Sequence, residues 1–64
     1  MYIKTERFKL DLDKVADILR KRGYTEEWVI ITPYQQEIKM YNLLENISAY
    51  IKDVKTHIVV TYSK

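Results

Sequence analysis

The stretch EWVIITPYQ at residues 27–35 decides the predicted fold of this 64-residue chain. Its first part, residues 27–32, contains the run Trp28-Val29-Ile30-Ile31, which is rich in β-branched residues, apolar at both parities and too short for a helix, and this indicates a buried strand. Thr32 is a favourable helix N-cap, Pro33 suits the first helical position, and Gln35 completes a capping box. The stretch therefore predicts a strand that passes directly into a helix at Pro33.

A stripe of apolar residues extends this second helix to about Asp53, because its members recur at helical spacing. The stripe comprises Met40, Leu43, Leu44, Ile47, Tyr50, Ile51 and Val54. Residues 56–62 read THIVVTY and are rich in β-branched side chains, which predicts a last strand.

Two further elements are predicted upstream. Residues 2–10 form a strand whose dense Lys and Arg content suits the edge of a sheet. Residues 11–22 form a helix, because apolar side chains recur at helical spacing, Asp11 or Asp13 can cap its start and Gly23 is the expected left-handed stop. The apolar side chains of this helix are Leu12, Val15, Ala16 and Leu19.

Alternation of strands with helices places the chain in the α/β class. The prediction is a single domain over residues 1–64, a small β-α-β-α-β layer with a three-stranded, mainly parallel sheet and two helices. If the strands lie in sequence order, right-handed crossovers put both helices on one face. The alternative strand order 2-1-3 puts one helix on each face, but the Lys and Arg content of the first strand opposes a central position.

Composition argues against catalysis. The chain has no Cys and a single Gly, which excludes disulfides, thiolate metal sites and a Gly-rich phosphate loop. His57 is interpreted as a surface or packing residue, and the carboxylates of Asp11, Asp13 and Asp17 as helix-capping and dipole-complementing groups. We therefore expect no catalytic residue, no cofactor and no metal, and a protein that is not an enzyme.

The predicted location is intracellular and the predicted partners do not include a membrane. No basic-apolar-small pattern typical of a signal peptide follows the N-terminus. The uninterrupted apolar runs are far shorter than a membrane span.

Basic side chains are concentrated in the first third of the chain, although the net charge is only +2. The run Arg20-Lys21-Arg22 has two interpretations. Cations at a helix C-terminus complement the helix dipole, or they contact phosphates with help from the first strand. The candidate nucleic-acid-binding residues are Lys4, Arg7, Lys9, Arg20, Lys21 and Arg22.

The segment from Val29 to Tyr34 resembles motif IV of superfamily 1 helicases of the nonsense-mediated-decay type. In that family a strand ends in a Thr-Pro-Tyr turn that opens a helix, and here Thr32-Pro33-Tyr34 stands at that place. The resemblance implies a piece of the second RecA-like domain, in which Tyr34 would face a nucleotide base. The family's phosphate loop and acidic metal-binding motif have no counterpart in this chain.

The leading functional hypothesis is a non-catalytic interaction module that acts through a protein or nucleic-acid surface, which the resemblance would make a helicase-domain remnant. The alternative is a helix-turn-helix DNA-binding protein, in which residues 11–22 form the first helix and a second begins at Thr25. Its weakness is the β-branched run into Thr32-Pro33, which makes a poor helix.

An apolar sheet face predicts association. Trp28 and Ile30 point to one side of their strand while Val29 and Ile31 point to the other, so one pair stays uncovered whichever face the helices occupy. The predicted interface residues are Trp28, Ile30 and Tyr62. The predicted partner is a second copy, giving a homo-oligomer, or a host protein.

Overall fold

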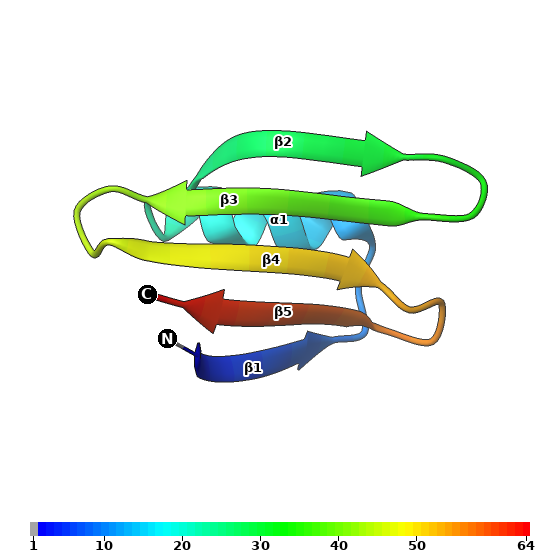
Figure 1. Cartoon of the computed structure of the whole chain (residues 1–64). Helices are drawn as coiled ribbons and strands as arrows, with labels where there is room; N and C mark the ends of the chain where they lie inside the picture. Colours follow the sequence, from blue (N-terminus) through cyan, green and yellow to red (C-terminus); the bar gives the residue numbers. More distant parts are fainter. Residues whose placement is uncertain (1) are drawn as a thin grey trace.

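The computed structural model describes residues 2–64 and contains one helix and five strands in one sheet (Figure 1). In chain order the elements are β1 (Tyr2–Phe8), α1 (Leu12–Lys21), β2 (Thr25–Ile31), β3 (Gln36–Asn42), β4 (Ile47–Asp53) and β5 (Ile58–Ser63).

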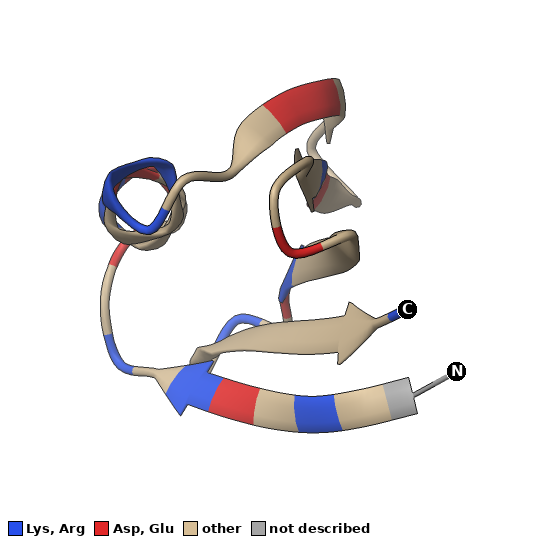
Figure 2. Ribbon diagram, turned by 90° about the vertical axis from the view of Figure 1, so that its left-hand side faces the viewer, with Lys and Arg blue, Asp and Glu red and all other residues tan. Residues whose placement is uncertain are grey.

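The sheet has the strand order β1-β5-β4-β3-β2, and every neighbouring pair is antiparallel. Strands β2 to β5 form a meander, while β1 pairs with β5 at the far side. Helix α1 carries the chain from the β1 edge to the β2 edge across one face of the sheet. Figure 2 shows α1 on this face and no element on the other, which we call the open face.

The core lies between α1 and the sheet. Strands β3, β4 and β5 bury alternate residues, because successive side chains of a strand point to opposite faces. The buried apolar side chains are Leu12, Val15, Ala16, Leu19, Tyr24, Ile38, Met40, Ala49, Ile51, Ile58, Val60 and Tyr62. Phe8 and Ile47 pack against this cluster while partly exposed.

The helix predicted over residues 11–22 is confirmed as α1. It ends in a Schellman motif: the Gly23 N–H donates to the Arg20 carbonyl and the Tyr24 N–H to the Leu19 carbonyl, both at 3.0 Å. Gly23 has φ +98°, the left-handed conformation that the sequence predicted for it. The Asn42 side chain also donates to the Arg22 carbonyl at 3.2 Å, which ties the helix end to β3.

The second predicted helix, residues 33–53, is wrong, because this region forms the hairpin of β3 and β4. Thr32 does act as a cap, but of a turn: its hydroxyl oxygen accepts hydrogen bonds from the N–H groups of Tyr34 at 3.2 Å and Gln35 at 2.9 Å. The main chains of Thr32 and Gln35 also pair with each other, so the residues between them close the β2–β3 hairpin. A cap and a proline thus start a turn as readily as a helix.

The apolar stripe of that predicted helix divides between two strands and a turn. Met40 lies on β3 and Ile51 on β4, where residues at two-residue steps face the core. Leu43 and Leu44 belong to the intervening turn, and Leu44 is 97% exposed. Two strands joined by an apolar turn therefore reproduced the spacing of a helix.

The α/β assignment is corrected accordingly: the protein is mostly β, with an antiparallel five-stranded sheet and one short helix. Both strand orders derived from a three-stranded parallel sheet are wrong. The edge position predicted for the first strand is confirmed by β1. The segment from Thr25 that a helix-turn-helix would need as its second helix is β2.

No helix in residues 2–64 has the length and apolar character needed to cross a membrane.

Candidate functional site

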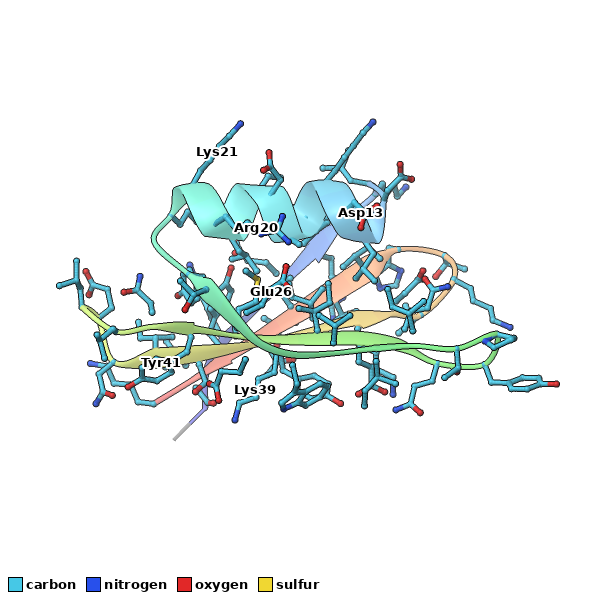
Figure 3. The ribbon with its side chains drawn as sticks, turned by 90° about the horizontal axis from the view of Figure 1, so that it is seen from above. Asp13, Arg20, Lys21, Glu26, Lys39 and Tyr41 are labelled. Atoms are coloured by element: carbon cyan, nitrogen blue, oxygen red, sulfur yellow. The ribbon has the colours of Figure 1, made fainter. Side chains whose placement is uncertain are left out.

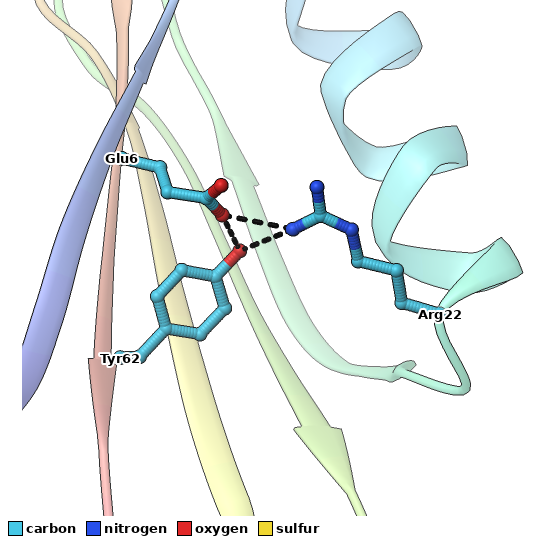
Figure 4. A network of polar contacts seen from close by, with 3 residues as sticks. All are labelled: Glu6, Arg22 and Tyr62. Atoms are coloured by element: carbon cyan, nitrogen blue, oxygen red, sulfur yellow. Dashed lines mark hydrogen bonds and ion pairs between the residues drawn. The ribbon is translucent and has the colours of Figure 1, made fainter.

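A polar network joins β1, the end of α1 and β5 (Figure 4). The guanidinium of Arg22 donates to Glu6 Oε1 at 2.8 Å and to the Tyr62 hydroxyl at 3.1 Å. The Tyr62 hydroxyl in turn donates to the same Glu6 oxygen. Lys4 Nζ lies over the ring of Tyr62, 5.2 Å from its centre. The network therefore fastens the helix terminus to the β1–β5 pair.

The network shifts the proton equilibria of its members. Partial burial by itself raises the pKa of Glu6, but hydrogen bonds from Tyr62 and Arg22 and the charges of Arg22 and Lys4 outweigh it and lower that pKa. The hydrogen bond to Glu6 raises the pKa of Arg22. Burial and then the hydrogen bond to Glu6 raise the pKa of Tyr62, so this phenol keeps its proton. The network holds one carboxylate and one guanidinium as a fixed ion pair.

The six candidate nucleic-acid-binding residues do not form one surface. Arg20 pairs with Glu26 (Figure 3), Lys21 pairs with Asp17 at 3.4 Å, and Arg22 pairs with Glu6. These pairs suit the interpretation of the run as a helix C-terminus. The other three residues lie in three different places. Lys4 lies over the Tyr62 ring on the helix side, Arg7 belongs to the open face, and Lys9 follows the end of β1.

The predicted interface residues are also divided. Trp28 and Ile30 share one face, as their parity predicted; that face is the open one, and Val29 and Ile31 lie on the helix side. Tyr62 lies on the helix side and is only 2% exposed. On the open face the ring of Trp28 meets the ring of Tyr50 edge to face, with centres 5.7 Å apart.

The strand register organises the open face into rows that cross the sheet. One row runs from β2 to β1 through Trp28, Lys39, Tyr50, Thr61 and Thr5. The next runs through Ile30, Glu37, Lys52, Val59 and Arg7. Figure 3 shows Lys39 and Tyr41 on the side of the sheet away from α1. The open face thus combines aromatic rings with cations.

Strand β2 is exposed along its whole length, although Trp28-Val29-Ile30-Ile31 is apolar. Two features cause this exposure. It is an edge strand, so its outer side pairs with no strand of the described chain. In addition, α1 packs chiefly over β4 and leaves Val29 and Ile31 uncovered on the helix side.

The two edges of the sheet differ. Strand β1 carries three charged side chains whose signs alternate, at Lys4, Glu6 and Arg7, and its pairing with β5 is irregular next to Tyr2. Both features hinder pairing with another strand. In β2 the charges and the irregularity are confined to the first half, at Glu26 and Glu27. The apolar second half has no such protection.

The remaining candidates lie elsewhere. Tyr34, which the helicase resemblance would place against a nucleotide, is 94% exposed at the tip of the β2–β3 hairpin. A depression of about 320 Å³ near His57 is lined mainly by charged and polar residues, among them Lys9, Asp11 and Asp53. Within residues 2–64, no group of His, Asp or Glu side chains is arranged to hold a metal ion.

Comparisons with protein-family models, with curated proteins and with solved structures found no match. The resemblance to superfamily 1 helicases stays a prediction, and the strand-to-helix turn on which it rests is a hairpin turn here.

Three residues of the open face were not identified as candidate site residues from the sequence, namely Lys39, Tyr50 and Lys52. The reason is that residues 33–53 were interpreted as a helix, which has no such face. The period-two alternation of Glu37, Lys39 and Tyr41 with Ile38 and Met40 was the signal that could have found this face.

Proposed function

We propose that this chain is a non-catalytic interaction module whose binding surface is the apolar half of β2, and whose partner is a second copy. The two copies pair through their β2 edges and form one continuous ten-stranded sheet. The observation that carries the proposal is the exposure of all seven β2 residues, four consecutive ones of which are large and apolar. When a second strand pairs with the β2 edge, it forms hydrogen bonds with the free backbone groups of β2. Its side chains also contact those of β2 on both faces of the sheet.

The charges of β2 favour an antiparallel, twofold-symmetric pairing. A parallel pairing would set Glu26 and Glu27 of the two copies side by side, where like charges repel. In an antiparallel pairing centred on Val29, Trp28 of each copy lies opposite Ile30 of the other, and Val29 lies opposite itself. The two Glu26 residues then stand at opposite ends, roughly 20 Å apart at a rise of about 3.3 Å per residue.

The size of the chain supports self-association. A domain this small buries a limited fraction of its surface, so its stability margin is thin. Pairing of β2 adds apolar burial and a row of main-chain hydrogen bonds without any change in fold. The β1 edges, with their alternating charges, remain at the two ends of the joint sheet.

The test is sedimentation velocity across micromolar concentrations. Wild type should sediment as a dimer that dissociates on dilution. Val29→Lys places like charges opposite each other at the twofold axis and removes an apolar contact from each copy, so the dissociation constant should rise at least about tenfold. Circular dichroism checks that the variant keeps the native fold.

The matched control is Leu44→Lys, which makes the same chemical change at a residue exposed in the β3–β4 turn. It should leave the dimer unchanged. A wild type that stays monomeric throughout the concentration range overturns the proposal, and so does equal weakening by both variants.

A further inference from the structure

The open face presents two aromatic rings, Trp28 on the edge strand β2 and Tyr50 on the middle strand β4. Trp28 and Tyr50 flank Lys39 in one cross-strand row. Each of the two aromatic residues is 37% exposed. The edge-to-face contact of the two rings holds them together above the sheet. Rings displayed on a sheet are platforms on which unpaired bases stack, with little dependence on base identity.

Cations outnumber carboxylates in the row that holds these rings and in the row next to it, which runs from Ile30 to Arg7. These two rows contain Lys39, Lys52 and Arg7, and no carboxylate of the described residues forms an ion pair with any of them. The carboxylate in these rows, Glu37, is 5% exposed and accepts a hydrogen bond from Gln35 at 2.5 Å. Cations that are free of internal partners are available for phosphates, whereas those at the end of α1 are paired.

We propose that the open face binds single-stranded nucleic acid. Bases stack on Trp28 and Tyr50, while Lys39, Lys52 and Arg7 contact the phosphates. The face lies within one copy, so this inference does not depend on the proposed self-association. In a dimer joined through β2, the two open faces would lie on the same side and form one longer surface.

The geometry favours single strands over duplexes. In a duplex the bases are stacked on one another, so their faces are closed to aromatic side chains. The one helix of the described chain lies on the opposite side of the sheet, and its basic end is bound in ion pairs. A sheet face with rings among cations instead matches the chemistry of an unpaired strand.

The experiment titrates the full chain with fluorescently labelled oligo(dU), oligo(U) and a DNA duplex at low salt, by anisotropy. Both single strands should bind more tightly than the duplex, and the two arms show whether the 2′-hydroxyl matters. The chain has one Trp, so quenching of Trp28 fluorescence reports directly on the open face. The affinity should fall as salt rises.

Variants separate stacking from charge. Tyr50→Ala should weaken binding of the single strands at least about fivefold, and Tyr50→Phe should retain it, because stacking needs only the ring. Lys39→Gln with Lys52→Gln should reduce the salt slope by about 1.4, the value for two lost phosphate contacts on a single strand.

The matched control removes two charges from α1, by Lys14→Gln with Lys21→Gln, and should leave the quenching and the slope nearly unchanged. Absence of binding at low salt overturns the proposal. It is equally overturned if the duplex binds as well as the single strands while Tyr50→Ala has no effect, or if the α1 pair weakens binding as much as the open-face pair.

Discussion

Among single residues, Tyr62 makes both polar and aromatic contacts. Its hydroxyl lies between Glu6 and Arg22, and its ring and that of Tyr24 meet edge to face with centres 6.0 Å apart. Alternation along β5 puts Tyr62 on the same face as Ile58 and Val60, but it does not say whether α1 covers that face. A tyrosine predicted to lie at an interface therefore became the anchor of the helix end.

Glu6→Gln tests the energetic role of this anchor. The pKa of Glu6 is lowered in the folded protein, so its ion pair contributes stability above the ordinary pKa of 4.5, and that contribution is lost as the pH falls through the lowered value. At neutral pH the variant should lose about 1 kcal/mol of unfolding free energy, since the pair is partly exposed to water. Urea unfolding at pH values from 7 to 3 measures the difference.

The difference between wild type and Glu6→Gln should shrink at the acid end of that range. Glu45→Gln, in the exposed turn after β3, is the control and should show no such convergence. A difference that stays constant with pH would mean that the carboxylate charge of Glu6 plays no part.

Among elements, α1 and the β3–β4 hairpin show why sequence reasoning succeeded once and failed once. For α1, apolar spacing, terminal charges and Gly23 all indicated the same helix, and each signal is local. For residues 33–53, the Thr32-Pro33 pair and the apolar spacing fitted a helix as well as they fitted two strands joined by a turn. The pairing of Ile38 with Ile51 decides between them, and that contact is not visible in local spacing.

Gly23→Ala tests the end of α1. A Cβ at this position would meet the Asn42 amide nitrogen at 3.3 Å, and φ +98° is strained for any residue with a side chain. The substitution should cost about 1–2 kcal/mol of unfolding free energy. Chemical denaturation measures it, and Gly23→Asn should lose less because Asn tolerates left-handed conformations better. An unchanged stability for Gly23→Ala would contradict the Schellman ending.

For the whole molecule, the order of the strands was beyond prediction from the sequence. It depends on β1 pairing with β5, segments at opposite ends of the chain, and no local pattern encodes such a pairing. The exposure of β2 follows from this order, because a strand that is apolar at both parities ends at an edge. The sequence did predict that Trp28 and Ile30 share a face, which is a local consequence of alternation.

Hydrogen exchange tests how this exposed edge behaves in the intact protein. In the two edge strands, alternate amides point away from the sheet, and in a monomer those of β1 and β2 should exchange rapidly, while amides of the central β4 and β5 are protected. If β2 pairs with a second copy, its outward amides become hydrogen bonded, and their protection should rise with protein concentration by mass action.

The β1 amides serve as the internal reference, because their edge stays free in the dimer and their protection should not change. Residue-resolved exchange at two protein concentrations measures both edges in each sample. Outward β2 amides that exchange as fast as those of β1 at the higher concentration would show that β2 remains an open edge.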